Sequence, residues 1–159
     1  MTLEIDPNGP NNMERGGVVH RDYAKYRCRS AKVIKIENVL TGETAKIATS
    51  GHDEQFCYKV GEMVEEPYYN TEIEIVCGEG IHFFMTKEPA VFYALLLMKF
   101  EGYTGEWMEW CDNGQRIQHV WYKDGKKILI MGGVVCECPK TGSWIAQGWG
   151  MEWRMGMLV

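Results

Sequence analysis

The side chains that could do acid–base or nucleophilic chemistry are few and scattered along the chain. His82 is the strongest candidate, because it lies in a well-patterned apolar stretch, Ile81-His82-Phe83-Phe84. An imidazole can act as a general base, although a histidine in such a strand is more often a hydrogen-bonded core residue. Cys57 and Cys77 are weaker candidates for a nucleophile, since no histidine stands at a spacing that pairs with either. The other histidines likewise lack a partner at readable spacing: His20, His52 and His119.

The six cysteines give little support for a metal or disulfide site. Cys136 and Cys138 are the only close pair, and structural zinc sites usually space their close ligands further apart. Residues 1–13 have neither a basic start nor an apolar core, so they are not a signal peptide, and the case for disulfides weakens. No phosphate-binding glycine loop or serine elbow appears. We predict buried free thiols, with no catalytic, cofactor-binding or metal-binding residue.

Length and composition indicate a globular protein of one ordinary domain, or two small ones that share a core. The chain has 159 residues, of which 45% are hydrophobic and 25% charged. Its net charge of -5 argues against bulk electrostatic binding to nucleic acid. The apolar run 90–100 is too short to cross a bilayer. We expect no nucleic-acid partner, no membrane span and a soluble protein folded in a reducing compartment.

The elements that position His82 form the centre of the predicted fold. Gly78 and Gly80 favour a tight turn, and the apolar strand 81–85 follows, with bulky residues on both faces. We therefore expect this strand to lie inside a sheet. Thr86 is a suitable N-cap for a helix over about 87–101, whose apolar run predicts burial on most sides. The fold class is α+β, mainly antiparallel β with one central buried helix.

The first part of the chain combines an arm with short strands. Residues 1–19 are rich in turn and breaker residues, and we expect an extended arm with no helix or strand of its own. Alternating patterns predict strands over 32–39, 46–49, 56–60 and 73–77. A basic series favours a solvated face, with a patch for phosphate or an acidic partner as the alternative: Arg15, Arg21, Lys25, Arg27, Arg29, Lys32 and Lys35.

The last third of the chain predicts a β-meander. Asn113-Gly114 and Asp124-Gly125 are strong hairpin signals, and each stands between stretches suited to strands. Residues 128–135 continue as an apolar strand. This region holds more tryptophans than one small core can bury, which favours a contact surface. The six are Trp107, Trp110, Trp121, Trp144, Trp149 and Trp153.

Several sequence blocks between Lys25 and Tyr93 carry a resemblance to a known family. They are Cys28-Arg29-x-Ala31-Lys32-Val33, then Tyr58-Lys59-Val60-Gly61-Glu62-x-Val64, then Cys77-x-x-Gly80-Ile81-His82-Phe83-Phe84, then Thr86-x-Glu88-x-Ala90-x-x-x-Tyr93. Together these blocks resemble an uncharacterised domain found in proteins of large double-stranded DNA viruses. Residues 103–115 are similar to a MORN-type repeat, and 120–126 begin another. The resemblance implies a viral association and no known reaction.

The sequence predicts three regions along the chain and leaves two classes of function open. We expect an arm over 1–19, a viral α+β domain over 20–101 and a MORN-like hairpin region over 102–159. The favoured function is a non-enzymatic structural protein, a minor capsid component of the virion that contacts other viral proteins through its arm and aromatic β region. Its expected location is the virion, otherwise the host cytoplasm. The alternative is an enzyme resembling ADP-ribosyltransferases, centred on His82 and Tyr93, although Ser50-Gly51-His52-Asp53 fits that family's upstream strand poorly.

Overall fold

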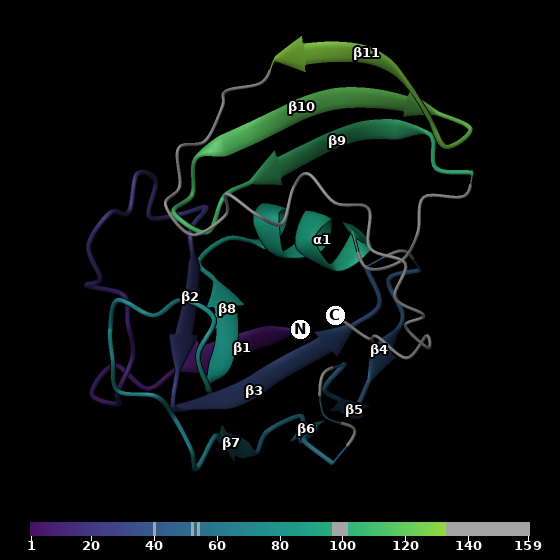
Figure 1. The fold of residues 1–159 in the computed structure, drawn as a ribbon. Coiled ribbons are helices and arrows are strands. Elements are labelled where there is room, and N and C mark those ends of the chain that lie inside the picture. Colours follow the sequence, from purple (N-terminus) through teal and green to yellow (C-terminus); the bar gives the residue numbers. More distant parts are fainter. Residues whose placement is uncertain (40, 52, 54, 97–101, 133–159) are drawn as a thin grey trace. The chain divides into compact units, whose positions relative to one another are not determined.

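The chain forms two compact units, each built from segments that are not contiguous in sequence. The computed structural model describes residues 1–39, 41–51, 53, 55–96 and 102–132. The first unit combines Met1–Gly16 with Tyr26–Phe83, and the second combines Gly17–Lys25 with the described residues from Phe84 onward. The described elements are antiparallel strands and one short helix (Figure 1), which confirms the β-rich α+β class.

Strand β3, Ser30–Glu37, is the centre of the first unit. It pairs antiparallel with three other strands, and β1 and β7 lie on opposite edges because both face Ala31 and Lys32. The side chains of Ala31, Val33 and Ile36 are fully buried, whereas Ile34 is 45% exposed, so burial does not alternate strictly along the strand. The remaining strands of this unit are β1 (Thr2–Ile5), β2 (Lys25–Cys28), β4 (Thr44–Ala45), β5 (Ile47–Thr49), β6 (Cys57–Lys59), β7 (Met63–Glu65) and β8 (Ile81–Phe84).

The N-terminal segment does form a strand, contrary to the prediction that 1–19 has none. β1 pairs with β3, with Leu3 opposite Val33 and Ile5 opposite Ala31. Further along, Asn12 is fully buried and Arg15 nearly so. The segment is ordered because its backbone and polar side chains bond to the rest of the first unit, which local composition alone does not reveal.

Two other strand predictions are wrong in part. Residues 73–77 form turns instead of a strand, and Ile73 and Ile75 are exposed. The predicted central strand 81–85 is β8, which pairs only with β2 among the described strands. Ile81 and Phe83 are buried on one face, whereas His82 on the other face is exposed. β8 is therefore covered on one side.

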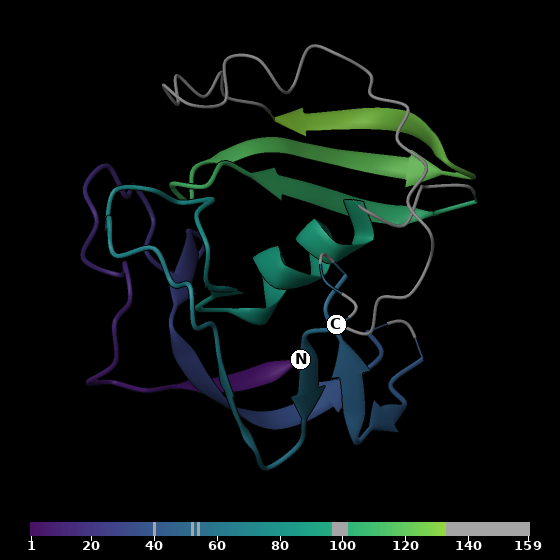
Figure 2. The same ribbon diagram turned by 60° about the horizontal axis from the view of Figure 1, so that its bottom comes forward.

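The second unit packs one helix against a three-stranded sheet. The helix α1, Lys87–Leu96, begins where predicted; residues 97–101 of the predicted range lie outside the described residues. Figure 2 shows α1 against one face of the sheet formed by β9 (Gly105–Trp110), β10 (Arg116–Lys123) and β11 (Lys126–Gly132). Of the helix side chains from Lys87 to Leu95, two are buried, four are half-buried and three are exposed, so the helix is less enclosed than expected, because only one face meets the sheet.

The two predicted hairpin turns of this sheet are present. Gly114 has a φ of 86°, and its amide donates to the Cys111 carbonyl at 2.9 Å. Asp124 and Gly125 have φ values of 49° and 72°, the left-handed conformation that a tight two-residue turn requires. These turns set the order β11-β10-β9.

Candidate functional site

The basic series of the first segment is only partly a solvated face. Arg27 is fully buried, and Lys25 and Arg15 are nearly so, whereas Arg29 is exposed and pairs with Glu65 at 2.8 Å. The prediction of a solvated face is therefore wrong for three of the seven residues. Because these three side chains are buried, they are not part of a basic surface patch.

Arg27 binds the backbone of the turn-rich segment 66–80. Its guanidinium donates to the carbonyl oxygens of Asn70, Glu72, Ile75 and Glu79, with the Ile75 bond at 2.7 Å from Nε. The aromatic ring of Tyr69 lies 4.8 Å from the guanidinium carbon. These carbonyls point inward at a cation instead of along a strand ladder, which explains why the alternating residues 73–77 do not form a strand. Arg27 is an organising residue of the fold and is closed to external ligands.

The residues of the enzyme alternative lie in different units. His82 is exposed on β8, and its Nε2 lies 3.1 Å from the Val76 carbonyl oxygen. Tyr93 belongs to α1, where its hydroxyl accepts a hydrogen bond from Lys25 Nζ at 3.2 Å and its ring packs on Phe84. Lys25, which is nearly buried, therefore contacts both the hydroxyl group and the aromatic ring of Tyr93.

A small hollow lies between α1 and β9, beside Tyr93. It has a volume of about 20 Å³, which is room for about one water molecule. Burial raises the pKa of Glu109, whose carboxyl lines the hollow, and Lys127 acts in the opposite direction. The hollow is too small for a nucleotide. Its other lining residues are Phe84, Pro89, Phe92, Tyr93, Met108 and Trp110.

A histidine–carboxylate pair on the sheet was not predicted. His119 Nε2 lies 2.6 Å from Glu106 Oε1, between β10 and β9. The register places His119 opposite Met108 and Glu106 opposite Trp121, so the pair is diagonal across the two strands. Pairing the residues of the two strands outward from the Asn113-Gly114 turn gives this register, so the sequence could have indicated the contact between His119 and Glu106. The pair links β10 to β9.

The cysteines differ from the prediction of buried free thiols. Cys28 is buried and free, and burial raises the pKa of its thiol to about 12, so it is not a nucleophile at neutral pH. Cys57 and Cys77 form no disulfide, but both are exposed, because they lie on the β5–β6 hairpin and in the 66–80 segment. Cys111 is disulfide-bonded. Cys136 and Cys138 lie outside the described residues.

Helix α1 covers only part of the sheet in the second unit. Trp107, Val120 and Ile130 stand opposite one another on β9, β10 and β11, and therefore share one face. Trp107 packs against Phe92 of α1, with ring centroids 5.1 Å apart. Exposure rises from 1% at Trp107 and 0% at Val120 to 69% at Ile130. The cover provided by α1 therefore ends before β11.

Strand β11 exposes four consecutive apolar side chains. Ile128, Leu129, Ile130 and Met131 are each more than half exposed, and Leu129 and Ile130 lie on opposite faces of the sheet. On the outer face Trp121 stands opposite Leu129 and is 40% exposed. The predicted aromatic contact surface is thus mainly aliphatic in the described part of the chain, since Trp107 is core. Trp144, Trp149 and Trp153 lie outside the described residues.

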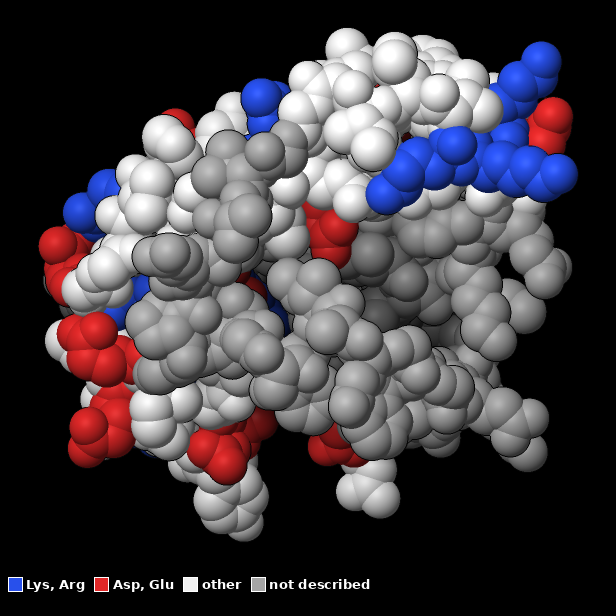
Figure 3. All heavy atoms as spheres, turned by 45° about the horizontal axis from the view of Figure 1, so that its top comes forward, with Lys and Arg blue, Asp and Glu red and all other residues white. Residues whose placement is uncertain are grey.

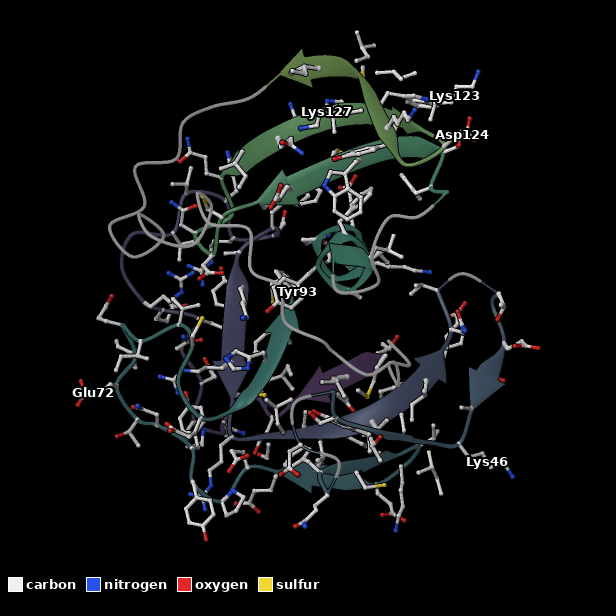
Figure 4. The ribbon with its side chains drawn as sticks, turned by 45° about the vertical axis from the view of Figure 1, so that its right-hand side comes forward. Lys46, Glu72, Tyr93, Lys123, Asp124 and Lys127 are labelled. Carbon is white, nitrogen blue, oxygen red and sulfur yellow. The ribbon has the colours of Figure 1, made fainter. Side chains whose placement is uncertain are left out.

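Lysines gather at the hairpin that joins β10 and β11. Figure 3 shows them in blue at one end of the sheet, beside an uncharged white area over the strands. Lys123 and Asp124 stand at the tip in Figure 4, and Lys127 reaches back to donate to Gln118 Oε1 at 3.1 Å. The uncharged run of β11 therefore has basic residues at its first end, Lys126 and Lys127.

Two kinds of site are absent from the described ranges. They contain no group of three or more His, Cys, Asp or Glu residues able to hold a metal ion. Within the same ranges, α1 is too short to cross a bilayer, and no membrane-spanning helix is present.

Comparison with known families identifies the chain by its first half. Residues 9–90, just over half of the sequence, match a family of unknown function (DUF5758). The chain belongs to this DUF5758 family. The match includes residues 25–90 of the stretch for which a family resemblance was predicted, and therefore both Arg27 and the 66–80 segment that it binds. No curated protein and no solved structure matches the chain.

Proposed function

We propose that this DUF5758 protein is a non-enzymatic interaction protein whose contact surface is the outer part of the β9–β11 sheet. The observation that carries the proposal is the exposed apolar run Ile128–Met131 on β11. Contiguous apolar surface of this kind is typical of protein–protein contact sites. The neighbouring Trp121 and the basic hairpin tip add an aromatic anchor and a polar rim.

The proposed setting is the particle of a large double-stranded DNA virus, where the protein would serve as a minor capsid component. The support for this setting is the resemblance of the blocks between Lys25 and Tyr93. The β9–β10 and β10–β11 hairpins, with their Asn-Gly and Asp-Gly turns, are the part of the chain proposed to be MORN-like. Because β1 is built into the first unit, the contacts are assigned to the sheet and not to the arm.

Quantitative mass spectrometry of purified particles tests this function. We expect the chain to be enriched in particles over infected-cell extract to the same degree as known particle proteins. The variant Ile130→Lys should lower incorporation, whereas Ile47→Lys, at another strand position with more than half of its side chain exposed, should not. A wild-type chain that stays in the extract and is depleted from particles would contradict the proposal.

A further inference from the structure

Among the described strands of the second unit, β11 lies at an edge of the sheet. β11 pairs with β10 on one side, and no other described strand pairs with it. A sheet edge presents unpaired N–H and C=O groups, and soluble proteins usually protect it with a charge, a proline or a bulge near its middle. The middle of β11 has no charge and no proline, only Ile128, Leu129 and Ile130, although its register with β10 shifts at Ile128 and again at Met131. Its residue types therefore leave it open to pairing with another strand.

Apolar side chains are exposed on both faces of the sheet at β11, and covering them would remove them from water. Ile130 extends the helix-side face beyond Val120, and Leu129 extends the outer face beside Trp121. Ile128 and Met131, where the register with β10 shifts, add further exposed apolar surface. A strand added at the edge would bury apolar side chains on both faces and satisfy the edge backbone groups at the same time. An occupant that packs on one face only would leave half of this surface in water.

We propose that the occupant is a second copy of this chain, paired antiparallel through β11 around a two-fold axis. The proposal deepens the interaction function above, because it names the partner of the same surface. An antiparallel pair centred on Leu129 sets Ile128 opposite Ile130 of the other copy and Leu129 opposite its counterpart. The apolar run is therefore complementary to itself, as an isologous interface requires.

Repulsion between lysines favours this antiparallel arrangement over a parallel one. In the antiparallel pair, Lys126 and Lys127 of the two copies stand at opposite ends, with Lys127 opposite Met131. The two Lys127 positions are then separated by four residues, or about 14 Å along the strands, which is beyond the Debye length of about 8 Å. A parallel pair would set the like charges side by side, at a cost in free energy. The sheet would continue from three strands in each copy across the two-fold axis.

Sedimentation velocity of the purified full chain over a concentration series tests the proposal. We expect a monomer–dimer equilibrium whose dissociation constant rises on the order of tenfold or more in Ile130→Lys, because the variant places a charge in the middle of the edge. Ile47→Lys, with a similar exposed isoleucine in β5, should leave it unchanged. Far-UV circular dichroism of each variant confirms that it is folded.

Amide hydrogen exchange provides a second measurement with the unchanged chain. The amides of 126–132 should become more protected as the protein concentration rises, because edge pairing engages the β11 backbone. A chain that is monomeric at every concentration overturns the proposal, and so does a dimer whose β11 amides stay unprotected or that forms equally well in Ile130→Lys. A monomeric chain that is still enriched in virus particles would leave the proposed function standing and remove only the self-pairing.

Discussion

Arg27 carries a positive charge into the core of the first unit, and its described acceptors are all backbone carbonyls. Hydrogen bonds from a charged donor each contribute about 1.5–3 kcal/mol, which offsets the cost of removing the guanidinium from water. Arg27 also fixes its own strand, because its amide donates to Asn12 Oδ1 at 2.8 Å. Close packing extends to Gly80, where an added Cβ would come within 3.2 Å of both Arg27 and Tyr69.

Replacing Arg27 should unfold the 66–80 segment and destabilise the first unit. Arg27→Met leaves several inward carbonyls without donors, and we expect a loss of about 3–5 kcal/mol in urea denaturation. Arg27→Lys should also destabilise, because one ammonium cannot reproduce the spread of the planar fork. The control is Arg29→Lys, at an exposed position whose pair with Glu65 should matter by less than about 1 kcal/mol. Equal denaturation midpoints for Arg27→Met and the control would contradict this role.

The buried role of Arg27 could not be predicted from sequence. Arginine is almost never fully buried, so a basic series is interpreted as solvated by default. The partners of Arg27 are carbonyls more than 40 residues away, and every residue type carries a carbonyl. No residue pattern marks such an acceptor. In contrast, the pair of His119 with Glu106 was within reach, because the register of a hairpin follows from its turn.

At the scale of elements, the correct predictions depended on local signals. Thr86 ahead of Lys87 marked the start of α1, and the two glycine turns marked the β9–β11 meander. β1 was missed because it forms only by pairing with β3, some thirty residues later in the chain. The strand predicted at 73–77 had the right alternation, but Arg27 binds its carbonyls.

Gly114 connects one of these local turns to a distant segment of the second unit. A Cβ added there would lie 2.1 Å from the His20 carbonyl oxygen and 2.9 Å from the Ala24 amide nitrogen. Both atoms belong to backbone, so they cannot move out of the way as the end of a side chain could. Lys25 and Val19 further join this segment to the turn, through bonds to the carbonyls of Asp112 and Asn113.

We therefore expect Gly114→Ala to be far more disruptive than an ordinary glycine substitution. The matched control is Gly17→Ala, where φ is also positive at 70° but no atom lies within 4 Å of the added Cβ. The control should lose about 1 kcal/mol from backbone strain alone. Gly114→Ala should lose about 3 kcal/mol or more, because the 20–24 backbone must shift. Thermal denaturation measures both, and similar melting temperatures would show that the close approach is unimportant.

At the scale of the whole chain, the two units interleave along the sequence. Residues 17–25 leave the first unit to join the second, and the chain returns at Tyr26 and leaves again at Phe84. Within the second unit, Tyr23 of this segment stacks on Trp110, with ring centroids 5.4 Å apart. The family match over 9–90 therefore includes parts of both units, and β9–β11 lie beyond it.

A fragment that starts at residue 102 should consequently fail to fold. It lacks Tyr23, which stacks on Trp110, and Phe92, which packs on Trp107. We expect weak near-ultraviolet circular dichroism and no cooperative thermal transition. Joining residues 17–25 to 84–159 through a short Gly-Ser linker restores both aromatic partners and should restore the transition. Cooperative unfolding of the 102–159 fragment alone would contradict this dependence.

The acceptors of Arg27 have a consequence for the conditions under which the 66–80 segment keeps its conformation. The exposed Gly16 amide holds the same segment through the Glu74 carboxylate. The acceptors of Arg27 in this segment, the carbonyl oxygens of Asn70, Ile75 and Glu79, are backbone groups and lie in a buried site. Burial also shields these bonds from dissolved ions. The anchoring of this segment by Arg27 is therefore the same in dilute buffer and in concentrated brine, whereas the exposed contact between Gly16 and Glu74 is open to dissolved ions.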